Sequence, residues 1–360
     1  MIHLLNLLAA VALLVWGTHI VRTGMLRVFG ENLRHVLARS VSNRFTAALA
    51  GLGGQISFYG KLAAEELGGR WTLPQTPQPL TAVERDVARE LPGLSRALRL
   101  IDIGLRNEGV REWNFTLRGM HDRELLAAAQ WACERQVWDR CINTSERTRV
   151  EIDLAQRFPT PYRDQVLARA RDAGVDEAFM FGLIRQESRF IVDARSQVGA
   201  SGLMQVMPAT ARWTAGKIGL PFRPDMINDR DVNLRLGASY LRIVLDDFGG
   251  SQAMAAAAYN AGPGRPRRWR EGATLEPAAW AEGIPFAETR DYVKKVLSNA
   301  VVYSALLARG PTAVTTATDG GGGGTAAAGG AGLKARLGPP VGPRVGLRTE
   351  AALAAERDIP

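Results

Sequence analysis

Cysteine and histidine are scarce in this chain of 360 residues. It contains two cysteines and four histidines, too few for a zinc ribbon, a histidine-rich metal centre or a disulfide scaffold. The sequence therefore predicts no metal and no cofactor. Cys133 and Cys141 are eight residues apart within a helical pattern, so we expect two free, packed thiols, which leaves the redox compartment open.

Lysine is also rare, so arginine supplies nearly all of the positive charge behind the formal net charge of +9. A basic chain favours polyanionic partners: nucleic acid, an anionic membrane face or the carboxylate-bearing peptides of a bacterial cell wall. The charge is scattered along the chain, and neither zinc-finger spacing nor an RNP-type aromatic motif accompanies it. Nucleic acid is therefore not a predicted partner.

Long apolar runs are absent except at the beginning of the chain. Residues 2–21 are almost wholly apolar, which is the length that a helix needs to cross a bilayer. No lysine or arginine precedes this stretch, whereas several arginines follow it, which is not the order found in a secretory signal. We expect a membrane helix, and the positive-inside rule would keep residues 22–44 on the cytoplasmic side.

The same opening segment carries two short sequences of a known type. Residues 4–10 read Leu-Leu-Asn-Leu-Leu-Ala-Ala and residues 16–19 read Trp-Gly-Thr-His. On these, residues 1–54 resemble the opening of the sodium/phosphate cotransporter family. The later membrane spans and the Gln-Ser-Ser motif of that family do not follow, and one span cannot build a transporter site. We interpret residues 1–54 as an anchor in a fused or composite reading frame.

The remainder of the chain is typical of an all-α protein. Residues 55–160 show short amphipathic patterns broken by prolines, and strand patterns are nearly absent. We predict a helical arm here, with Trp113, Trp131 and Trp138 packed in its core. Residues 161–309 form a second helical block, and residues 310–360, rich in Gly, Ala and Pro, are expected to be a disordered tail.

Residues 176–188 have the apolar spacing of a helix that carries a carboxylic acid on its apolar face. Apolar residues at 180, 183 and 184 precede Glu187 in the i, i+3, i+4, i+7 pattern. Such neighbours would raise the pKa of Glu187 and keep it protonated near neutral pH, as a general acid requires. The alternative is a rim glutamate paired with Arg185 or Arg189.

Three further segments favour the first interpretation. Residues 199–205 form a glycine-punctuated loop that can bring its backbone and the Gln205 amide close to a ligand. Residues 255–260 form an alanine-rich helix, stopped by Gly262 and Pro263, whose end can aim the Tyr259 hydroxyl and the Asn260 amide into a cleft. Residues 284–293 open a helix that runs to about residue 307, with Glu288 in its first turn.

Taken in order, these segments resemble the soluble lytic murein transglycosylase family. The resemblance rests on Glu-Ser at 187–188, Gly-Leu-Met-Gln at 202–205, Ala-Tyr-Asn-Ala-Gly at 258–262 and Glu-Thr-Arg at 288–290. It implies an all-α, goose-lysozyme-like catalytic domain preceded by a helical superhelix, most of which is missing here. Members cleave the β-1,4 bond between N-acetylmuramic acid and N-acetylglucosamine and leave a 1,6-anhydromuramic acid.

The resemblance also implies roles for individual residues. Glu187 would be the sole acid/base, and the other positions would bind or orient the substrate: Ser188, Met204, Gln205, Tyr259, Asn260, Glu288 and Arg290. Simpler readings remain open for four of them, since a serine or an asparagine can cap a helix, and a methionine or a tyrosine can belong to the core.

No second carboxylate occupies an equivalent motif position, although hydrolytic glycosidases ordinarily place two across the bond. We interpret Asp193 as a solvated loop charge, and Asp229 and Asp231 as caps of the following helix. One carboxyl group is enough when the 6-hydroxyl of the muramic sugar replaces water as the nucleophile. A water-using muramidase and a catalytically idle peptidoglycan-binding module are the alternatives.

The expected partners are peptidoglycan glycan strands and, through the N-terminal helix, a membrane. We therefore expect a periplasmic, membrane-anchored protein. The positive-inside rule conflicts with this location, because it would leave the catalytic domain in the cytoplasm. The oligomeric state and the choice between endo and exo cleavage stay open.

Overall fold

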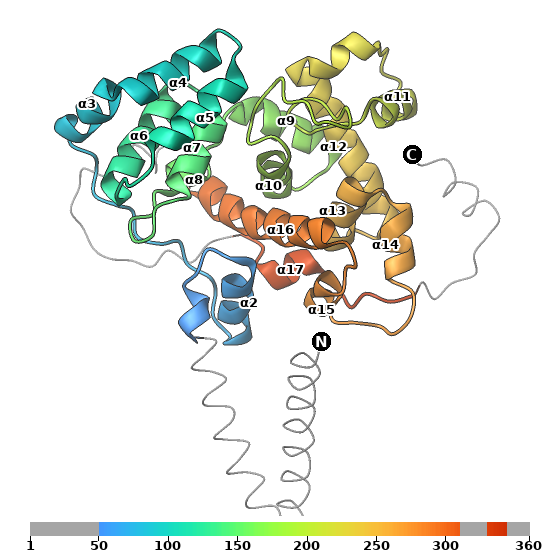
Figure 1. Ribbon diagram of the computed structural model, residues 1–360. Coiled ribbons are helices and arrows are strands. Elements are labelled where there is room, and N and C mark those ends of the chain that lie inside the picture. Colours follow the sequence, from blue (N-terminus) through green and yellow to red (C-terminus); the bar gives the residue numbers. More distant parts are fainter. Residues whose placement is uncertain (1–49, 310–329, 344–360) are drawn as a thin grey trace, which may run out of the picture.

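The computed structural model describes residues 50–309 and 330–343, and the regular structure in these ranges is helical. Apart from isolated bridges such as Leu275 with Val341, the described residues form no strands, so the prediction of an all-α fold is confirmed. Figure 1 shows an arm of short helices beside a larger helical body. The expected membrane helix at 2–21 lies outside the described residues, and none of the described helices is long and apolar enough to span a membrane.

The arm begins after a proline-rich segment and is built around its own apolar core. Trp113 is fully buried there and donates from Nε1 to Thr144 Oγ1 at 2.8 Å. Trp131 and Trp138 pack against the same core, as predicted. The helices of the arm are α3 (Ala82–Glu90), α4 (Pro92–Asp102), α5 (Arg106–Thr116), α6 (Asp122–Glu134), α7 (Trp138–Ser145) and α8 (Leu154–Arg157).

Cys133 and Cys141 form a disulfide, so the prediction of two free thiols is wrong. In one continuous helix, eight residues rise about 12 Å, which is too far for a bridge. The chain instead turns between α6 and α7, which brings the two Cα atoms to 5.0 Å, within the usual range for a disulfide.

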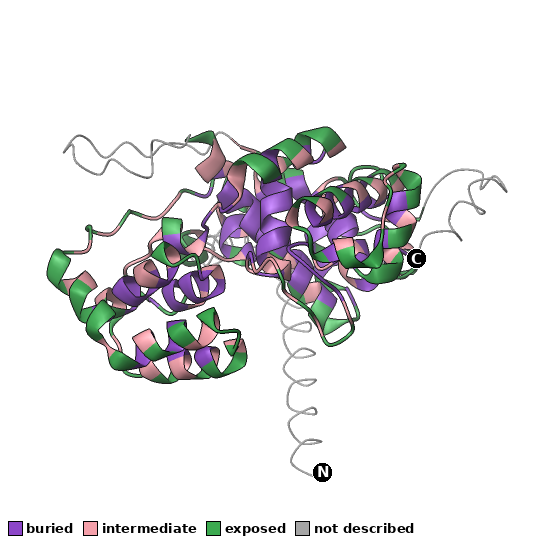
Figure 2. Ribbon diagram, turned by 90° about the horizontal axis from the view of Figure 1, so that it is seen from above, coloured by how far each residue is buried: buried purple, intermediate pink, exposed green. Residues whose placement is uncertain are grey.

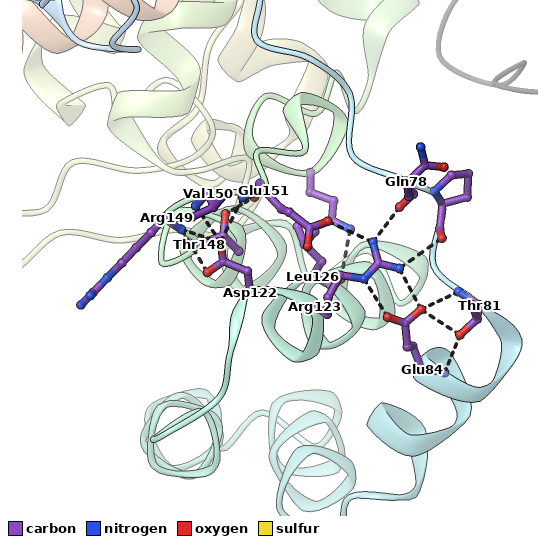
Figure 3. Close-up of polar contacts among 12 residues, drawn as sticks. Gln78, Thr81, Glu84, Asp122, Arg123, Leu126, Thr148, Arg149, Val150 and Glu151 are labelled. Atoms are coloured by element: carbon purple, nitrogen blue, oxygen red, sulfur yellow. Dashed lines mark hydrogen bonds and ion pairs between the residues drawn. The ribbon is translucent and has the colours of Figure 1, made fainter. Parts of the chain in front are cut away.

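Arg123 on α6 holds the entrance of the arm in place (Figure 3). Its guanidinium forms an ion pair with Glu84 on α3 at 2.7 Å and another with Glu151 at 3.1 Å. Thr81 caps α3 by accepting from the backbone N–H of Glu84 at 3.2 Å. Asp122 accepts three consecutive backbone N–H groups, those of residues 149–151, at 2.7–3.1 Å. These contacts fasten the loops of the arm to its helices.

The larger body is assembled around α10 (Glu177–Glu187) and α16 (Ala287–Ala308), which cross closely. Gly182 makes the close approach possible, because a Cβ at this position would lie 2.8 Å from Val296 O and 2.9 Å from Ala300 N. Figure 2 shows the buried residues concentrated in the middle of the larger body. The helices of the body are α9 (Arg163–Ala173), α10 (Glu177–Glu187), α11 (Pro208–Lys217), η1 (Pro224–Asn228), α12 (Arg230–Asp247), α13 (Gln252–Ala261), α14 (Gly264–Trp269), α15 (Pro277–Glu282) and α16 (Ala287–Ala308).

The helix α2 (Phe58–Glu66) belongs to the larger body, although the predicted boundary placed residues 55–160 in one arm. Phe58 and Trp71 lie in the core of the larger body. Lys61 is fully buried, donates to Ser298 Oγ at 2.9 Å and lies 4.4 Å from the centre of the Trp71 ring. These contacts with α16 attach the segment to the body.

A second departure concerns the tail, because residues 330–343 pack against the larger body. The short helix α17 (Leu333–Leu337) begins where Glu65 accepts the backbone N–H groups of Leu333 and Lys334, at 2.5 and 2.8 Å. Arg336 is buried and pairs with Asp176 at 2.8 Å. The expected disorder of residues 310–360 is therefore wrong for residues 330–343, because Leu333, Leu337 and Val341 lie in the core of the larger body. The rest of the tail lies outside the described residues.

Candidate functional site

Glu187 is the last residue of α10, and that helix lies where residues 176–188 predicted it. Asp176 caps its beginning by accepting from the backbone N–H of Phe179 at 2.6 Å. The apolar face is buried, with Met180, Leu183 and Ile184 at 0% exposure. This face carries Glu187 against α16, at the point where that helix begins.

Tyr292 on α16 holds the Glu187 carboxyl group. Its hydroxyl donates to Glu187 Oε1 at 2.5 Å. Burial raises the pKa of Glu187 to about 8, the hydrogen bond from Tyr292 opposes that rise, and the charge of Glu288 one turn earlier on α16 adds to it. Glu187 is therefore largely protonated at neutral pH, as its position on an apolar helix face predicts.

The neighbouring arginines do not pair with Glu187. Arg185 and Arg189 both bind the carboxylate of Glu146 from the arm, at 2.7 and 2.9 Å. Arg185 is buried and also donates from Nε to Arg157 O at 2.9 Å. These contacts direct both guanidinium groups toward the arm, so the alternative of a rim glutamate paired with an arginine is not what the structure contains.

Tyr259 and Asn260 come from the end of α13, and both are half-buried. The Tyr259 hydroxyl donates to Met204 O at 2.8 Å, and its ring centre lies 5.5 Å from that of Tyr240. Burial, followed by the charge of Glu187, raises the pKa of Tyr259 well above its usual value. Asn260 Oδ1 accepts from Thr289 Oγ1 at 2.7 Å, which fastens α13 to α16.

The side chain of Asn233 on α12 is hydrogen-bonded to the loop at 199–205. The Asn233 amide donates to Ser201 O at 2.8 Å and to Ile227 O at 2.9 Å, while its oxygen accepts from the backbone N–H of Met204 at 2.9 Å. Gly202 passes directly over this amide with φ 79°, and a Cβ there would lie 2.3 Å from Asn233 Nδ2. Only glycine fits this approach.

Two predicted sugar contacts in this loop have partners within the protein. Met204 is fully buried beneath α12, where Gly237 leaves room for its side chain; its surroundings are those of a core residue. The Gln205 amide donates to Ala194 O at 3.0 Å and to Gly202 O at 2.8 Å, so its N–H groups shape the loop.

Ser188 lies in the turn after α10, where its buried hydroxyl donates to Ile184 O at 3.3 Å and accepts from the backbone N–H of Phe190 at 3.1 Å. Arg189 and Phe190 then adopt left-handed backbone angles, with φ 49° and 65°. Two non-glycine residues in this conformation are costly, and the Ser188 hydroxyl bridges the turn. Its contacts are those of a cap, and a bond to the Glu187 carboxyl is not among them.

Glu288 and Arg290 lie in the first turn of α16, one exposed and the other half-buried. Glu288 acts on the Glu187 pKa, whereas Arg290 reaches the carbonyl of Glu282 at 3.4 Å. Of the predicted residues, Glu288 thus acts on the pKa of Glu187, and Glu187 acts on that of Tyr259.

Sequence reasoning missed Tyr292, Thr289 and Asn233. A signal existed for the first two. Tyr292 follows Glu288 by one helical turn within the segment 284–293, and Thr289 is the middle residue of the Glu-Thr-Arg motif at 288–290. Asn233 gave no signal, since an asparagine inside a helical pattern is ordinarily exposed. Within the described ranges, no three His, Cys, Asp or Glu side chains gather in a way that could hold a metal ion.

An all-α body with a protonated glutamic acid at a helix end is typical of lysozyme-like domains. Three family models match: "Transglycosylase SLT domain" over residues 165–278, "Soluble lytic murein transglycosylase L domain" over 88–150 and "Soluble lytic transglycosylase helical domain" over 283–311. The chain belongs to the soluble lytic murein transglycosylase family. Glu187, Met204, Gln205, Tyr259 and Asn260 fall within the first match, and Tyr292 within the third.

The similar proteins are consistent with this assignment. The soluble lytic murein transglycosylase of Salmonella typhimurium is 33% identical over 250 residues, which is 68% of this chain and 38% of that protein. A crystal structure of an inactive glutamate-to-glutamine mutant of the lytic transglycosylase Slt from Pseudomonas aeruginosa is 38% identical, with TM-score 0.68, over 76% of this chain and 45% of that chain. The chain thus spans less than half the length of these relatives.

A separate match concerns 53 residues, or 15% of the chain. They are 68% identical to part of the protein YjbB of Escherichia coli O157:H7, whose name refers to inorganic phosphate export, and they cover 10% of that protein. The match agrees with the transporter resemblance of the opening residues.

Proposed function

We propose that this chain is a lytic transglycosylase that cleaves the β-1,4 bond between N-acetylmuramic acid and N-acetylglucosamine, with Glu187 as its acid and base. The observation that carries the proposal is the half-buried Glu187, whose pKa is raised to about 8 and whose Oε1 is fixed by Tyr292. Since Oε1 is engaged, Oε2 is the atom that presents the proton to the substrate. Membership of the family supports the same bond as the target.

The reaction then has two steps in which Glu187 changes role. First, Glu187 gives its proton to the glycosidic oxygen, the bond from that oxygen to C1 breaks, and the N-acetylglucosamine side leaves as an alcohol. The Tyr292 hydroxyl stabilises the carboxylate that forms. Next, the carboxylate takes the proton of the muramic 6-hydroxyl while that oxygen bonds to C1 of its own ring. The product is the 1,6-anhydro sugar, and Glu187 is protonated again.

The first experiment is digestion of purified peptidoglycan, with mass spectrometry of the products. Fragments that end in a sugar one water lighter than a free reducing end support the proposal. Glu187→Gln should abolish release of fragments, since the amide cannot donate the proton, and Glu112→Gln on the arm is a matched control that should retain activity. Full lytic activity of Glu187→Gln would contradict the proposal and favour the idle binding module.

One observation favours the hydrolytic alternative, a muramidase. Glu288 is an exposed carboxylate in the first turn of α16, one turn before Tyr292, and such a second carboxylate could orient a water molecule. The product decides between the two reactions, because a muramidase leaves a free reducing end. If that product dominates in wild type and is lost in Glu288→Gln, the hydrolytic alternative replaces our proposal.

We also infer a periplasmic location with an anchor in residues 2–21. The disulfide between Cys133 and Cys141 supports an oxidising compartment, and peptidoglycan is found on that side of the inner membrane. The positive-inside rule predicts the opposite orientation. We give the disulfide more weight, because disulfides are rare in a reducing cytoplasm. Alkaline phosphatase fused after residue 309 tests this, because the reporter is active only outside the cytoplasm; an inactive fusion of normal abundance would refute the location.

A further inference from the structure

Two arginines flank Glu187 in the chain, and a single carboxylate of the arm binds both. Arg185 lies two residues before Glu187, and Arg189 lies two residues after it. Glu146, the residue that follows α7, accepts from Arg185 Nη2 at 2.7 Å through Oε1 and from Arg189 Nη1 at 2.9 Å through Oε2. The arm therefore contacts the end of α10 on both sides of the proposed acid.

The position and the charge of Glu146 are both fixed. Its backbone N–H continues the hydrogen bonding of α7, and Arg157 donates from Nε to the neighbouring carbonyl of Ser145 at 3.0 Å. Burial raises the pKa of Glu146, but the charges of Arg185 and then of Arg189 outweigh burial and hold that pKa below its usual value. Glu146 is thus a carboxylate at neutral pH, and hydrogen bonds between ionised partners are the strong ones.

Arg185 extends this contact into the two helices of the site. It is 5% exposed, and besides Glu146 it binds Arg157 O at 2.9 Å and Asn299 Oδ1 on α16 at 3.4 Å. Two residues correspond to roughly 200° of rotation about a helix, so Arg185 leaves α10 on the side opposite Glu187. The guanidinium joins the arm to α10 and α16, the helices that carry Glu187 and its hydrogen-bond donor.

Arg189 holds the turn that follows the proposed acid. Arg189 and Phe190 have left-handed backbone angles, with φ 49° and 65°, which non-glycine residues keep only where surrounding contacts enforce them. Phe190 is 1% exposed and Arg189 is bound to Glu146, so both residues of the turn are anchored. Loss of the Glu146 contact would free one of these anchors and let the end of α10 relax.

The exact place of the Glu187 carboxyl group matters because a proton is transferred only over a short distance. Oε1 is engaged by Tyr292 at 2.5 Å, so the place of Oε2 depends on where α10 ends relative to α16. A general acid must lie within roughly 2.6–3.2 Å of the atom that it protonates, and a misplacement of about 1 Å can lower a rate about 100-fold. A carboxylate that fixes the end of α10 therefore affects kcat from a distance.

We propose that Glu146 is a positioning residue of the arm, which holds the end of α10 through Arg185 and Arg189 so that Glu187 meets the glycosidic oxygen. The inference rests on the proposed function and gives the arm a part in it. Glu146 acts through α10 and not on the reacting atoms. Removing its charge should therefore lower kcat and leave KM nearly unchanged, because α13 and the loop at 199–205 take no part in this contact.

The test measures kcat and KM on soluble glycan strands of peptidoglycan. Glu146→Gln keeps the shape of the side chain and removes its charge; kcat should fall about tenfold while KM stays within about twofold. Arg189→Gln leaves the pair between Glu146 and Arg185 in place, so kcat should fall about threefold. Glu112→Gln is the matched control, because this arm carboxylate also binds an arginine, Arg96 at 2.6 Å, but within the arm; it should keep the wild-type kcat.

The double variant tests whether Glu146 and Arg189 act as one unit. Glu146→Gln combined with Arg189→Gln should be no slower than Glu146→Gln alone, because Arg189 then has no carboxylate to bind. A further loss of about threefold in the double variant would show that the two residues act independently and would overturn the proposal. If Glu146→Gln does not fold, Arg189→Gln decides by itself, since its loss leaves the buried Arg185 paired.

Fluorine NMR gives a readout that needs no catalysis. Fluorotyrosine incorporated at the six tyrosines of the chain provides a resonance for Tyr292, which is assigned by its absence from Tyr292→Phe. Glu146→Gln should shift this resonance, because the contact of Tyr292 with Glu187 changes with the end of α10, whereas Glu112→Gln should leave it in place. A Tyr292 resonance that Glu146→Gln does not move would overturn the proposal.

An unchanged kcat in both Glu146→Gln and Arg189→Gln would also overturn it. In that case, continued release of 1,6-anhydro ends by wild type leaves the proposed function intact. If wild type releases no such ends, the proposed function fails, and the Tyr292 resonance still decides whether Glu146 holds the end of α10.

Discussion

Replacing Glu187 by glutamine should make the protein more stable at alkaline pH. In the folded chain Glu187 keeps its proton to about pH 8, whereas the ordinary value of 4.5 applies once the chain unfolds. Between these values the folded state binds more protons than the unfolded state, so the wild type loses stability as pH rises. Glutamine has no proton to lose, keeps the shape of the side chain and can accept from the Tyr292 hydroxyl.

The magnitude follows from the burial of this side chain. At roughly 1.4 kcal/mol per pH unit, moving the pKa from 4.5 to about 8 corresponds to about 5 kcal/mol above pH 8. The side chain is only half-buried, and water screens part of that cost, so we expect about 2–3 kcal/mol. Below pH 4.5 both states of the wild type hold the proton, and the two proteins should agree within about 0.5 kcal/mol.

Urea unfolding at pH 4.5, 7 and 9 measures this difference. The gap between Glu187→Gln and wild type should open with pH, and Glu90→Gln, which changes an exposed glutamate of the arm, should show no such trend. If the free energies of unfolding of Glu187→Gln and wild type stay parallel from pH 4.5 to 9, Glu187 is not a buried acid and the reasoning is refuted.

Three further predictions concern the contacts around this group. Tyr292→Phe removes the donor to Glu187 Oε1; kcat should fall about tenfold, and the alkaline limb of its pH profile should move upward, while an unchanged profile would contradict the assigned contact. Gly182→Ala should cost about 1–3 kcal/mol in urea unfolding, because its Cβ meets the α16 backbone, whereas Gly216→Ala, with open space around it, should not destabilise. Cys133→Ser should lose about 2.5 kcal/mol, the loop entropy of an eight-residue separation, and a reductant should cause the same loss in wild type only.

Periodicity was sufficient to find the elements that carry the site. The patterns at 176–188, 255–260 and 284–307 correspond to α10, α13 and α16, because an apolar stripe with helical spacing must be buried whatever it packs against. Of the two aspartates interpreted as caps, Asp229 is one, since it accepts from the backbone N–H of Val232 at 2.9 Å. The interpretation of Asp231 was wrong, because its side chain pairs with Arg169 at 2.8 Å. Capping is a local interaction, so local sequence predicts it.

Predictions that depended on contacts between residues far apart in the chain were wrong or undecided. Met204 could face a sugar or the core, and the space beside Gly237 on α12 decided for the core. The two cysteines meet only because the chain turns between α6 and α7. Residues 330–343 looked too poor in aliphatic side chains to be ordered, yet Glu65 and Asp176 supply partners that no local pattern reveals.

The sequence by itself determined that Glu187 lies on the buried side of a helix, because that property needs only the 3.6-residue period and four neighbouring residues. Only the tertiary structure decided how the carboxyl group is held, since Tyr292 is 105 residues away in the chain and reaches Glu187 through the packing of α16 on α10. A carboxyl pKa depends on atoms within a few ångströms in space, and the local pattern around Glu187 does not reveal which distant residues supply those atoms.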